Sequence, residues 1–218
     1  MIKRKNILKI AIDSPAAAGA GTLAKALSDH YNLFYLDTGK IYRFIAYLKI
    51  KFPKKFNNKF IKSKINSLKI KDLSDKNLLS DKVGTEASVI SKIKSIRNMV
   101  HSFQINFAYN PPKKYKGSCL DGRDITYNIV PDADFKFYIT ANVKTRALRR
   151  YKELKGLKKI TTYEEVLKSI KNRDKSDLNR KISPLKKTKD SLLINTTNLN
   201  KRACFLKIKK IIDRKINN

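Results

Sequence analysis

Short apolar runs of strand length alternate along this chain with longer segments of helical character. The five runs cover residues 7–12, 33–36, 118–120, 135–140 and 191–195. The helical segments cover residues 22–31, 41–51, 85–109, 143–155, 163–175 and 201–215. Because strands that alternate with helices form a parallel sheet covered on both faces, the pattern predicts an α/β fold. With 218 residues, of which 41% are hydrophobic, the chain can bury one sizeable core, so we expect one domain over residues 1–218.

One stretch fits this alternation poorly. Residues 52–81 are rich in Lys, Asn and Ser. They are a candidate for a small subdomain or a flap over a substrate, and a loose lysine-rich connection is the alternative.

A large excess of positive charge runs through the whole chain. Fifty Lys and Arg residues against 18 Asp and Glu residues give a formal net charge of +32. A field of this size attracts nucleic acid, anionic membranes or phosphorylated small molecules. The lysines are scattered among Asn and Ile residues and do not form one tail, which favours a solvated lysine-rich surface over a nucleic-acid site.

The sequence has neither a membrane span nor a disulfide framework. Residues 1–20 are similar to a signal peptide in their order of basic, apolar and alanine-rich parts, but Lys9 interrupts the apolar run and Asp13 ends it. Cys119 and Cys204 stand alone, without metal-ligand spacing. We therefore expect two buried reduced thiols and a cytoplasmic protein.

Small residues fill the connection between the first strand and the first helix. They let a phosphate approach the backbone closely, and the N–H groups at a helix start attract anions, as in a P-loop. Thr22 would offer its hydroxyl oxygen to Mg²⁺, directly or through water. Ser14 replaces the first glycine of the GxxxxGK pattern and Ala20 replaces its lysine, so a plain strand-to-helix turn is the alternative. The predicted phosphate-binding residues are Ser14, Pro15, Ala16, Ala17, Ala18, Gly19, Ala20, Gly21 and Thr22.

Three further clusters of polar and charged residues lie at the ends of predicted elements. They are Thr38 and Arg43 after the second strand, Asp121, Arg123 and Asp124 after the third, and Arg173, Asp177 and Arg180 in a helix. Arginine binds two phosphate oxygens at once, and carboxylates hold Mg²⁺-bound water or a substrate amine. A capped helix, a salt-bridged turn and surface ion pairs are the alternatives for the three clusters taken singly.

Five segments together resemble the bacterial cytidylate kinases, in that family's order. Residues 12–22 are similar to IDGPxGxGKGT, residues 37–43 to D(S/T)GAxYR, and residues 120–124 to xDGRD. Residues 130–140 resemble the family's PDA turn and fourth strand, and residues 173–180 resemble RDxxDxxR. The last two segments distinguish this family from adenylate, shikimate and thymidylate kinases.

The resemblance implies a P-loop nucleoside monophosphate kinase fold, with a five-stranded parallel sheet of order 2-3-1-4-5 flanked by helices. Residues 52–84 would form the insert that binds the nucleoside monophosphate, and residues 143–160 a lid-like region. The implied reaction transfers the γ-phosphoryl group of ATP, with Mg²⁺, to CMP or dCMP, as part of pyrimidine metabolism. We expect a monomer that binds these nucleotides and neither nucleic acid nor a membrane. A kinase for UMP and a catalytically inactive nucleotide-binding or nucleic-acid-binding relative are the alternatives.

The resemblance also implies roles for individual residues. The residues implied to bind CMP are Thr38, Arg43, Arg97, Arg123, Asp124, Arg173, Asp177 and Arg180, and those added to the small-residue segment for ATP are Arg149 and Arg150. Of these, Arg123, Arg173 and Arg180 would gather charge around the transferred group, and are the implied catalytic arginines. Arg146 would lie with Arg149 and Arg150 over the donor phosphates, and a basic solvated helix is the alternative. Either Ser88 or Ser91 would contact cytosine.

The missing lysine leads to one hypothesis about catalysis. Phosphoryl transfer depends on positioned positive charge, and losing one such donor costs about 3 to 4 kcal/mol. Lys40 stands where the family pattern has a small residue. We therefore predict that Lys40 is catalytic and supplies the ammonium that Ala20 lacks; an exposed lysine on a lysine-rich surface is the alternative.

Overall fold

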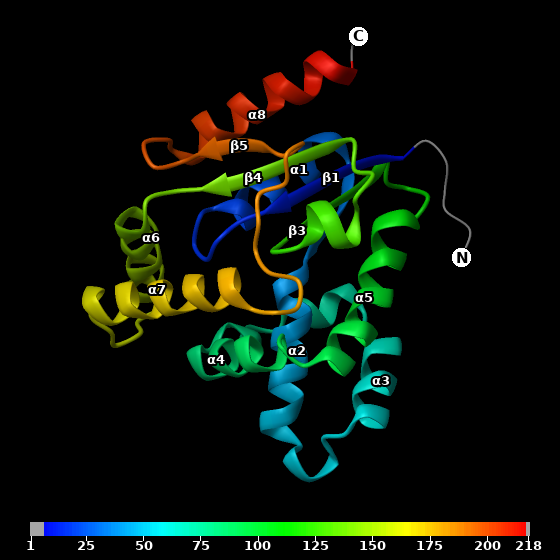
Figure 1. Ribbon diagram of the computed structural model, residues 1–218, viewed down its shortest axis with the longest axis vertical. Helices are drawn as coiled ribbons and strands as arrows, with labels where there is room; N and C mark the ends of the chain where they lie inside the picture. The colour runs from blue at the N-terminus through cyan, green and yellow to red at the C-terminus, as the bar shows by residue number, and fades with distance from the viewer. Residues whose placement is uncertain (1–6, 217–218) are drawn as a thin grey trace.

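The computed structural model describes residues 7–216, and these fold around one parallel sheet (Figure 1). Its strands are β1 (Leu8–Asp13), β2 (Leu33–Asp37), β3 (Gly117–Gly122), β4 (Phe135–Thr140) and β5 (Leu192–Asn195). All four pairings are parallel and the strand order is β2-β3-β1-β4-β5, which confirms the predicted α/β fold and sheet order. Residues 1–6 and 217–218, which belong to the predicted domain and in part to the signal-like run, lie outside the described residues.

Helices cover both faces of the sheet. They are α1 (Ala20–Tyr31), α2 (Thr38–Lys51), α3 (Asn58–Asn66), α4 (Asp81–Ile90), α5 (Lys94–Tyr109), α6 (Val143–Gly156), α7 (Tyr163–Asn179) and α8 (Lys201–Ile216). Successive side chains of β1 point to opposite faces, so Ile10 and Ile12 pack with α1 and α8 while Ala11 packs with α2 and α5. Helices α3 and α4 lie below the sheet in Figure 1, whereas α5 extends from there up to the sheet.

The helix predicted over residues 85–109 is wrong, because the structure divides it into α4 and α5. Ile93, between the two helices, has an extended backbone with φ −82° and ψ 115°. The side chain of Arg97 donates a hydrogen bond of 3.1 Å to the Ser91 carbonyl oxygen. A buried arginine thus occupies a backbone acceptor at the break, and neither glycine nor proline marks the position in the sequence.

Residues 52–84 are a packed part of the structure and not a loose connection. They form α3, the start of α4 and the short helices η1 (Pro53–Lys55), η2 (Ile70–Ser74) and η3 (Lys76–Leu79). Their buried side chains Ile61, Ile65 and Leu73 share one core with residues of the sheet and of α2. Substrate binding by this segment stays a prediction.

Helices α6 and α7 form a hairpin with its own small core, at the side of the sheet in Figure 1. That core consists of Ala147, Leu154, Val166 and Ile170. The π-helical segment η4 (Ile125–Ile129) follows β3. Across residues 7–216, none of the helices is both long and apolar enough to cross a bilayer.

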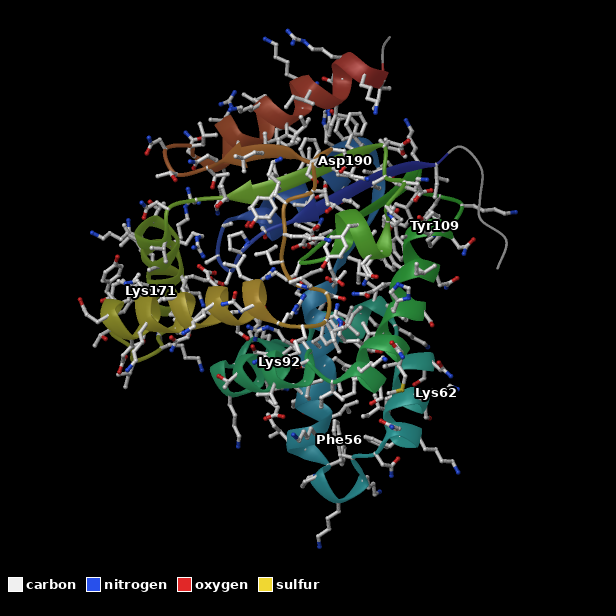
Figure 2. The ribbon with its side chains drawn as sticks, viewed as in Figure 1. Phe56, Lys62, Lys92, Tyr109, Lys171 and Asp190 are labelled. Atoms are coloured by element: carbon white, nitrogen blue, oxygen red, sulfur yellow. The ribbon has the colours of Figure 1, made fainter. Side chains whose placement is uncertain are left out.

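The two cysteines are buried free thiols, as expected. Exposed lysines lie on well-separated parts of the molecule, for example Lys62 on α3, Lys92 between α4 and α5, and Lys171 on α7 (Figure 2). The positive charge is therefore distributed widely over the surface.

Candidate functional site

A cleft of about 1070 Å³ lies at the carboxyl ends of the strands. Parallel α/β sheets bind their ligands at this edge. The cleft is lined by all of residues 14–22, by the polar residues Thr38, Ser88, Ser91 and Thr196, by the carboxylates of Asp37, Asp121, Asp124 and Asp177, and by Arg43, Arg97, Arg123, Arg149, Arg150, Arg173 and Arg180, among others. One cavity therefore collects every predicted site residue except Lys40 and Arg146, which are not among the described lining residues.

Residues 14–22, the small-residue loop, comprise the connection from β1 to α1 and the first turn of α1, and two of them have a left-handed backbone. Ala17 has φ 59°, and Gly19 has φ 89° and ψ 7°. The loop is held from outside: Ser14 N–H donates to the Gly122 carbonyl oxygen at 3.2 Å, and Thr196 Oγ1 donates to the Ala18 carbonyl oxygen at 3.1 Å. Its backbone shape is thus fixed by neighbouring elements without a lysine at Ala20.

Six charged residues form the arginine–aspartate cluster, and they come from α5, from the turn between β3 and η4, and from α7 and the residue that follows it. They are Arg97, Arg123, Asp124, Arg173, Asp177 and Arg180. In its buried core, Arg97 Nη2 lies 2.5 Å from Asp124 Oδ2, and both side chains are under 10% exposed. Asn128 Nδ2 donates to the same carboxylate oxygen at 2.8 Å. The two predicted CMP-binding residues Arg97 and Asp124 therefore form one buried pair.

Asp177 is the carboxylate around which the other three arginines of the cluster gather. Arg123 Nε donates to its Oδ2 at 2.7 Å, and nitrogens of Arg173 and Arg180 lie 4.0 and 3.9 Å from its carboxylate. Burial alone raises the pKa of Asp177, but the charges of Arg123 and Arg173 outweigh it and lower the pKa below its ordinary value. Asp177 therefore stays ionised at neutral pH.

Arg173 lies on the wall of the cleft with 39% of its side chain exposed. Burial by the surrounding protein, followed by the charge of Arg123, lowers its pKa to about 10. The guanidinium is still protonated at neutral pH and keeps a positive charge in the cleft.

Two aligned carboxylates stand at the strand ends next to the loop. Asp37 and Asp121 are paired in register on β2 and β3. Burial, and then the charge of Asp37, raise the pKa of Asp121, although Tyr35 Oη donates to its Oδ1 at 2.9 Å. Lys40, in the first turn of α2, contributes a positive charge that lowers this pKa, but its half-buried side chain is not among the described residues that line the cleft.

The other predicted residues of α2 are bonded to protein groups. Thr38 Oγ1 donates to the Asp121 carbonyl oxygen at 2.8 Å. Arg43 Nη1 donates to the Leu78 carbonyl oxygen at 2.7 Å, so this arginine contacts the segment of residues 52–84. Ser88 and Ser91 both line the cleft, and the choice between them stays open.

The three arginines of α6 make different contacts. Arg149 donates to the carbonyl oxygens of Thr196 and Leu199, at 2.6 and 3.3 Å, while Arg150 lies 3.0 Å from Glu153. Arg146, expected beside them, is buried and lies behind the loop, where its Nη1 donates to the Ala16 carbonyl oxygen at 3.0 Å.

The sequence did not predict the contacts of several residues that build the site. Asp13 is fully buried at the end of β1, and its carboxylate accepts hydrogen bonds from Ile125 N–H, Thr126 N–H and Thr126 Oγ1. Burial raises the pKa of Asp13 from 3.8 to about 6. The signal for Asp13 was an acidic residue at the end of an apolar strand, whereas nothing local indicated the partners of Tyr35 or Arg146.

Oxygen ligands for a cation are available where Thr22 and Asp121 line the cleft. Hydroxyl and carboxylate oxygens suit Mg²⁺, which keeps several water or phosphate ligands of its own. In residues 7–216, no group of three or more His, Cys, Asp or Glu residues forms a metal-binding cluster. The donor set therefore fits a Mg²⁺ ion that arrives with a nucleotide.

Comparisons with known proteins identify the family of this chain. The family model for cytidylate kinase matches residues 10–214. The cytidylate kinase of Bartonella tribocorum (strain CIP 105476 / IBS 506) is 42% identical over 199 residues, which are 90% of each chain. The cytidylate kinase of Mesomycoplasma hyopneumoniae (strain 7448) is 35% identical over 96% of this chain and 95% of its own.

A solved structure described as an uncharacterized protein from Eubacterium ventriosum ATCC 27560 is similar in fold alone. It matches with a TM-score of 0.56 and 15% identity, over 94% of this chain and 98% of that chain.

Together with the sequence relatives, the family model confirms the resemblance read from the five segments, and the chain belongs to the cytidylate kinase family.

Proposed function

We propose that the cleft transfers the γ-phosphoryl group of ATP to CMP or dCMP, giving ADP and CDP or dCDP. The observation that carries this proposal is the meeting of the small-residue loop with seven arginines in one cavity. Phosphoryl transfer needs positioned positive charge around the moving group and little covalent chemistry from the protein. Family membership and this charge distribution support the same reaction.

On the donor side, the small-residue loop binds the phosphates of ATP through backbone N–H groups at the start of α1. Arg149 and Arg150 add positive charge from α6. Thr22, directly or through water, and Asp121, through water, would hold the Mg²⁺ that arrives with ATP, and the ion would supply positive charge next to the donor phosphates.

On the acceptor side, Thr38, Arg43 and Arg97 hold the monophosphate. Asp124 and Arg123 face the pyrimidine with Ser88 or Ser91, while Arg173, Asp177 and Arg180 engage the sugar and phosphate. Arg123, Arg173 and Arg180 stabilise the transition state. Ionised Asp177 supports this role because it keeps the three guanidinium groups close together.

Lys40 supplies the ammonium that the loop lacks. This role is supported by the positive charge of Lys40, which lowers the pKa of Asp121 at the edge of the cleft. The backbone carbonyl of Asp121 accepts a hydrogen bond from Thr38, an acceptor-side residue. The flexible four-carbon stem of Lys40 must turn towards the bound phosphates, since it does not line the cleft among the described residues.

The protein acts as a monomer in the cytoplasm, with ATP and the cytidine nucleotides as its partners. A scattered surface charge supports neither a nucleic-acid site nor a membrane site.

The experiment measures ADP release from ATP and Mg²⁺ with CMP, dCMP, UMP and AMP in parallel. Turnover confined to CMP and dCMP is expected. Preference for UMP would overturn the assigned acceptor, and no turnover with any acceptor would overturn the kinase.

Lys40→Ala tests the displaced lysine. We expect kcat to fall about 10² to 10³-fold, and Ala20→Lys to restore part of it in the same chain. Lys51→Ala, which removes an exposed lysine from the same helix, is the matched control. Unchanged turnover in Lys40→Ala would refute the role of Lys40.

A further inference from the structure

Arg146 makes an unusual set of contacts behind the small-residue loop. Its Nε donates to the Ala141 carbonyl oxygen at 2.9 Å, and its Nη1 donates to the Ala16 carbonyl oxygen at 3.0 Å. The two terminal nitrogens also form a bidentate pair with Asp174, at 3.0 and 2.6 Å. One buried guanidinium thus joins the loop, the end of β4, α6 and α7.

The contact to Ala16 acts on the peptide that precedes Ala17. Ala17 has φ 59°, a left-handed conformation that disfavours alanine. The carbonyl of Ala16 lies in the peptide plane that turns when φ of Ala17 changes. A hydrogen bond to this carbonyl therefore opposes relaxation of Ala17 to the ordinary right-handed region.

The hydrogen bond from Arg146 to Ala16 also sets the direction in which the N–H group of Ala17 points. In a trans peptide the C=O and N–H groups point in opposite directions. When Ala16 C=O faces Arg146, the N–H of Ala17 points away from Arg146, and Ala17 lines the cleft whereas Arg146 does not belong to the described lining. The N–H is thereby available to a phosphate.

The contact to Asp174 links this loop to the acceptor residues. Asp174 follows Arg173 directly and lies one turn before Asp177 on α7. Bidentate arginine–carboxylate pairs fix orientation as well as distance. A shift of α7 is therefore transmitted to the loop through Arg146.

We propose that Arg146 is a positioning residue that holds the Ala16–Ala17 peptide in its phosphate-binding orientation and fixes the small-residue loop against α7. This inference rests on the proposed function, which it deepens by naming what orients the donor loop once the lysine is gone. Arg146 is not among the described residues that line the cleft, and it acts through the backbone of Ala16 and the carboxylate of Asp174.

The test is a double-mutant cycle read by calorimetric binding of ADP, so that turnover is not needed. The variants are Arg146→Met, Ala17→Gly and their combination, with Lys144→Met as the matched control because it removes an exposed charge from the same turn of α6. We expect Arg146→Met to weaken ADP binding at least fivefold. Ala17→Gly should improve binding at least fivefold more in Arg146→Met than in the parent, because glycine adopts the left-handed conformation without help.

Additive effects of Arg146→Met and Ala17→Gly would overturn the proposal, as would parental ADP affinity in Arg146→Met. If Arg146→Met fails to fold, Arg146→Lys replaces it, because one ammonium keeps the charge but not the fork that reaches Ala16 and Asp174 together. Asp174→Asn should also weaken ADP binding, although Asp174 is on α7, and unchanged binding there would refute the link to α7. A parent that binds ADP without making CDP would refute the proposed kinase alone, since the cycle is still read on ADP.

Discussion

The small-residue loop and the arginine–aspartate cluster face the same cleft but are built in opposite ways. The loop offers backbone groups, and its side chains from Ser14 to Gly21 carry no charge. The cluster consists entirely of charged side chains, several of them buried and paired with one another. The loop depends on backbone angles, whereas the cluster depends on charge balance.

This difference explains where the sequence departs from its family pattern. Against IDGPxGxGKGT, Ser14 and Ala17 replace glycines and Ala20 replaces the lysine. Hydrogen bonds that Thr196, Arg146 and the Ser14 N–H donate still fix the path of the loop. In the cluster every charge has a partner, so a single replacement leaves a buried charge uncompensated. We therefore expect substitutions in the cluster to have the larger effects.

Removal of the Asp124 charge should give the largest effect. Asp124→Asn leaves Arg97 buried with its positive charge unbalanced, and the free energy of unfolding should fall by about 3 to 5 kcal/mol. The kcat/KM for CMP should fall with it. Urea unfolding and initial rates measure the two changes.

Asp29→Asn provides the comparison for this prediction. Asp29 pairs with Lys25 at the surface, where both side chains are more than half exposed, so its loss should cost less than about 1 kcal/mol. Equal losses in the two variants would show that burial does not govern the arginine–aspartate cluster.

Asp13 lies between the small-residue loop and the arginine–aspartate cluster, and its titration should make the free energy of unfolding depend on pH. It ends β1, just before the loop, and binds the backbone of Ile125 and Thr126, just after Asp124. Because burial raises its pKa from 3.8 to about 6, the folded chain keeps a proton that the unfolded chain has lost. The free energy of unfolding should therefore fall by about 3 kcal/mol from this group as the pH rises from about 4 to above 6.

The measurement compares parent and Asp13→Asn by urea unfolding at several pH values. Asparagine does not titrate, so the stability of the parent relative to the variant should decline over this range. A constant difference would mean that Asp13 keeps an ordinary pKa.

The predictable parts of this molecule are those whose signal is local in sequence. The strand ends at Asp37 and Asp121 follow apolar runs, and the sheet edge brings them together in any parallel α/β fold. The contacts of Arg146 could not be predicted, because Ala16 and Asp174 lie 130 and 28 residues away. The break between α4 and α5 was hidden for a different reason, because it contains no glycine or proline and involves a hydrogen bond from the side chain of Arg97 to the Ser91 carbonyl oxygen.

Gly122→Ala tests the acceptor side of the cleft by crowding Thr38. A Cβ at Gly122 would lie 2.4 Å from Thr38 Oγ1 and 2.8 Å from Ile125 Cδ1. Thr38 or β3 must move, which should cost about 1 to 3 kcal/mol of stability and raise the KM for CMP. If the KM for ATP rose instead, Thr38 would not belong to the acceptor side.

Gly19→Ala should have the smallest effect, and for a different reason. No atom lies within 4 Å of a Cβ at Gly19, so the substitution does not crowd the loop, but φ of 89° is unfavourable for alanine by about 1 to 2 kcal/mol. We expect the KM for ATP to rise about fivefold to thirtyfold. The KM for CMP should change much less, because backbone angles define only the donor side.

Gly156→Ala is the control that separates the effect of a left-handed φ from the effect of adding a methyl group. Gly156, at the end of α6, also has open space around its Cβ but no left-handed φ, so the free energy of unfolding should stay within about 0.5 kcal/mol of the parent. If Gly19→Ala raised the KM values for CMP and ATP equally, the loop would shape both substrate sites, and the contrast between backbone-built and charge-built regions would fail.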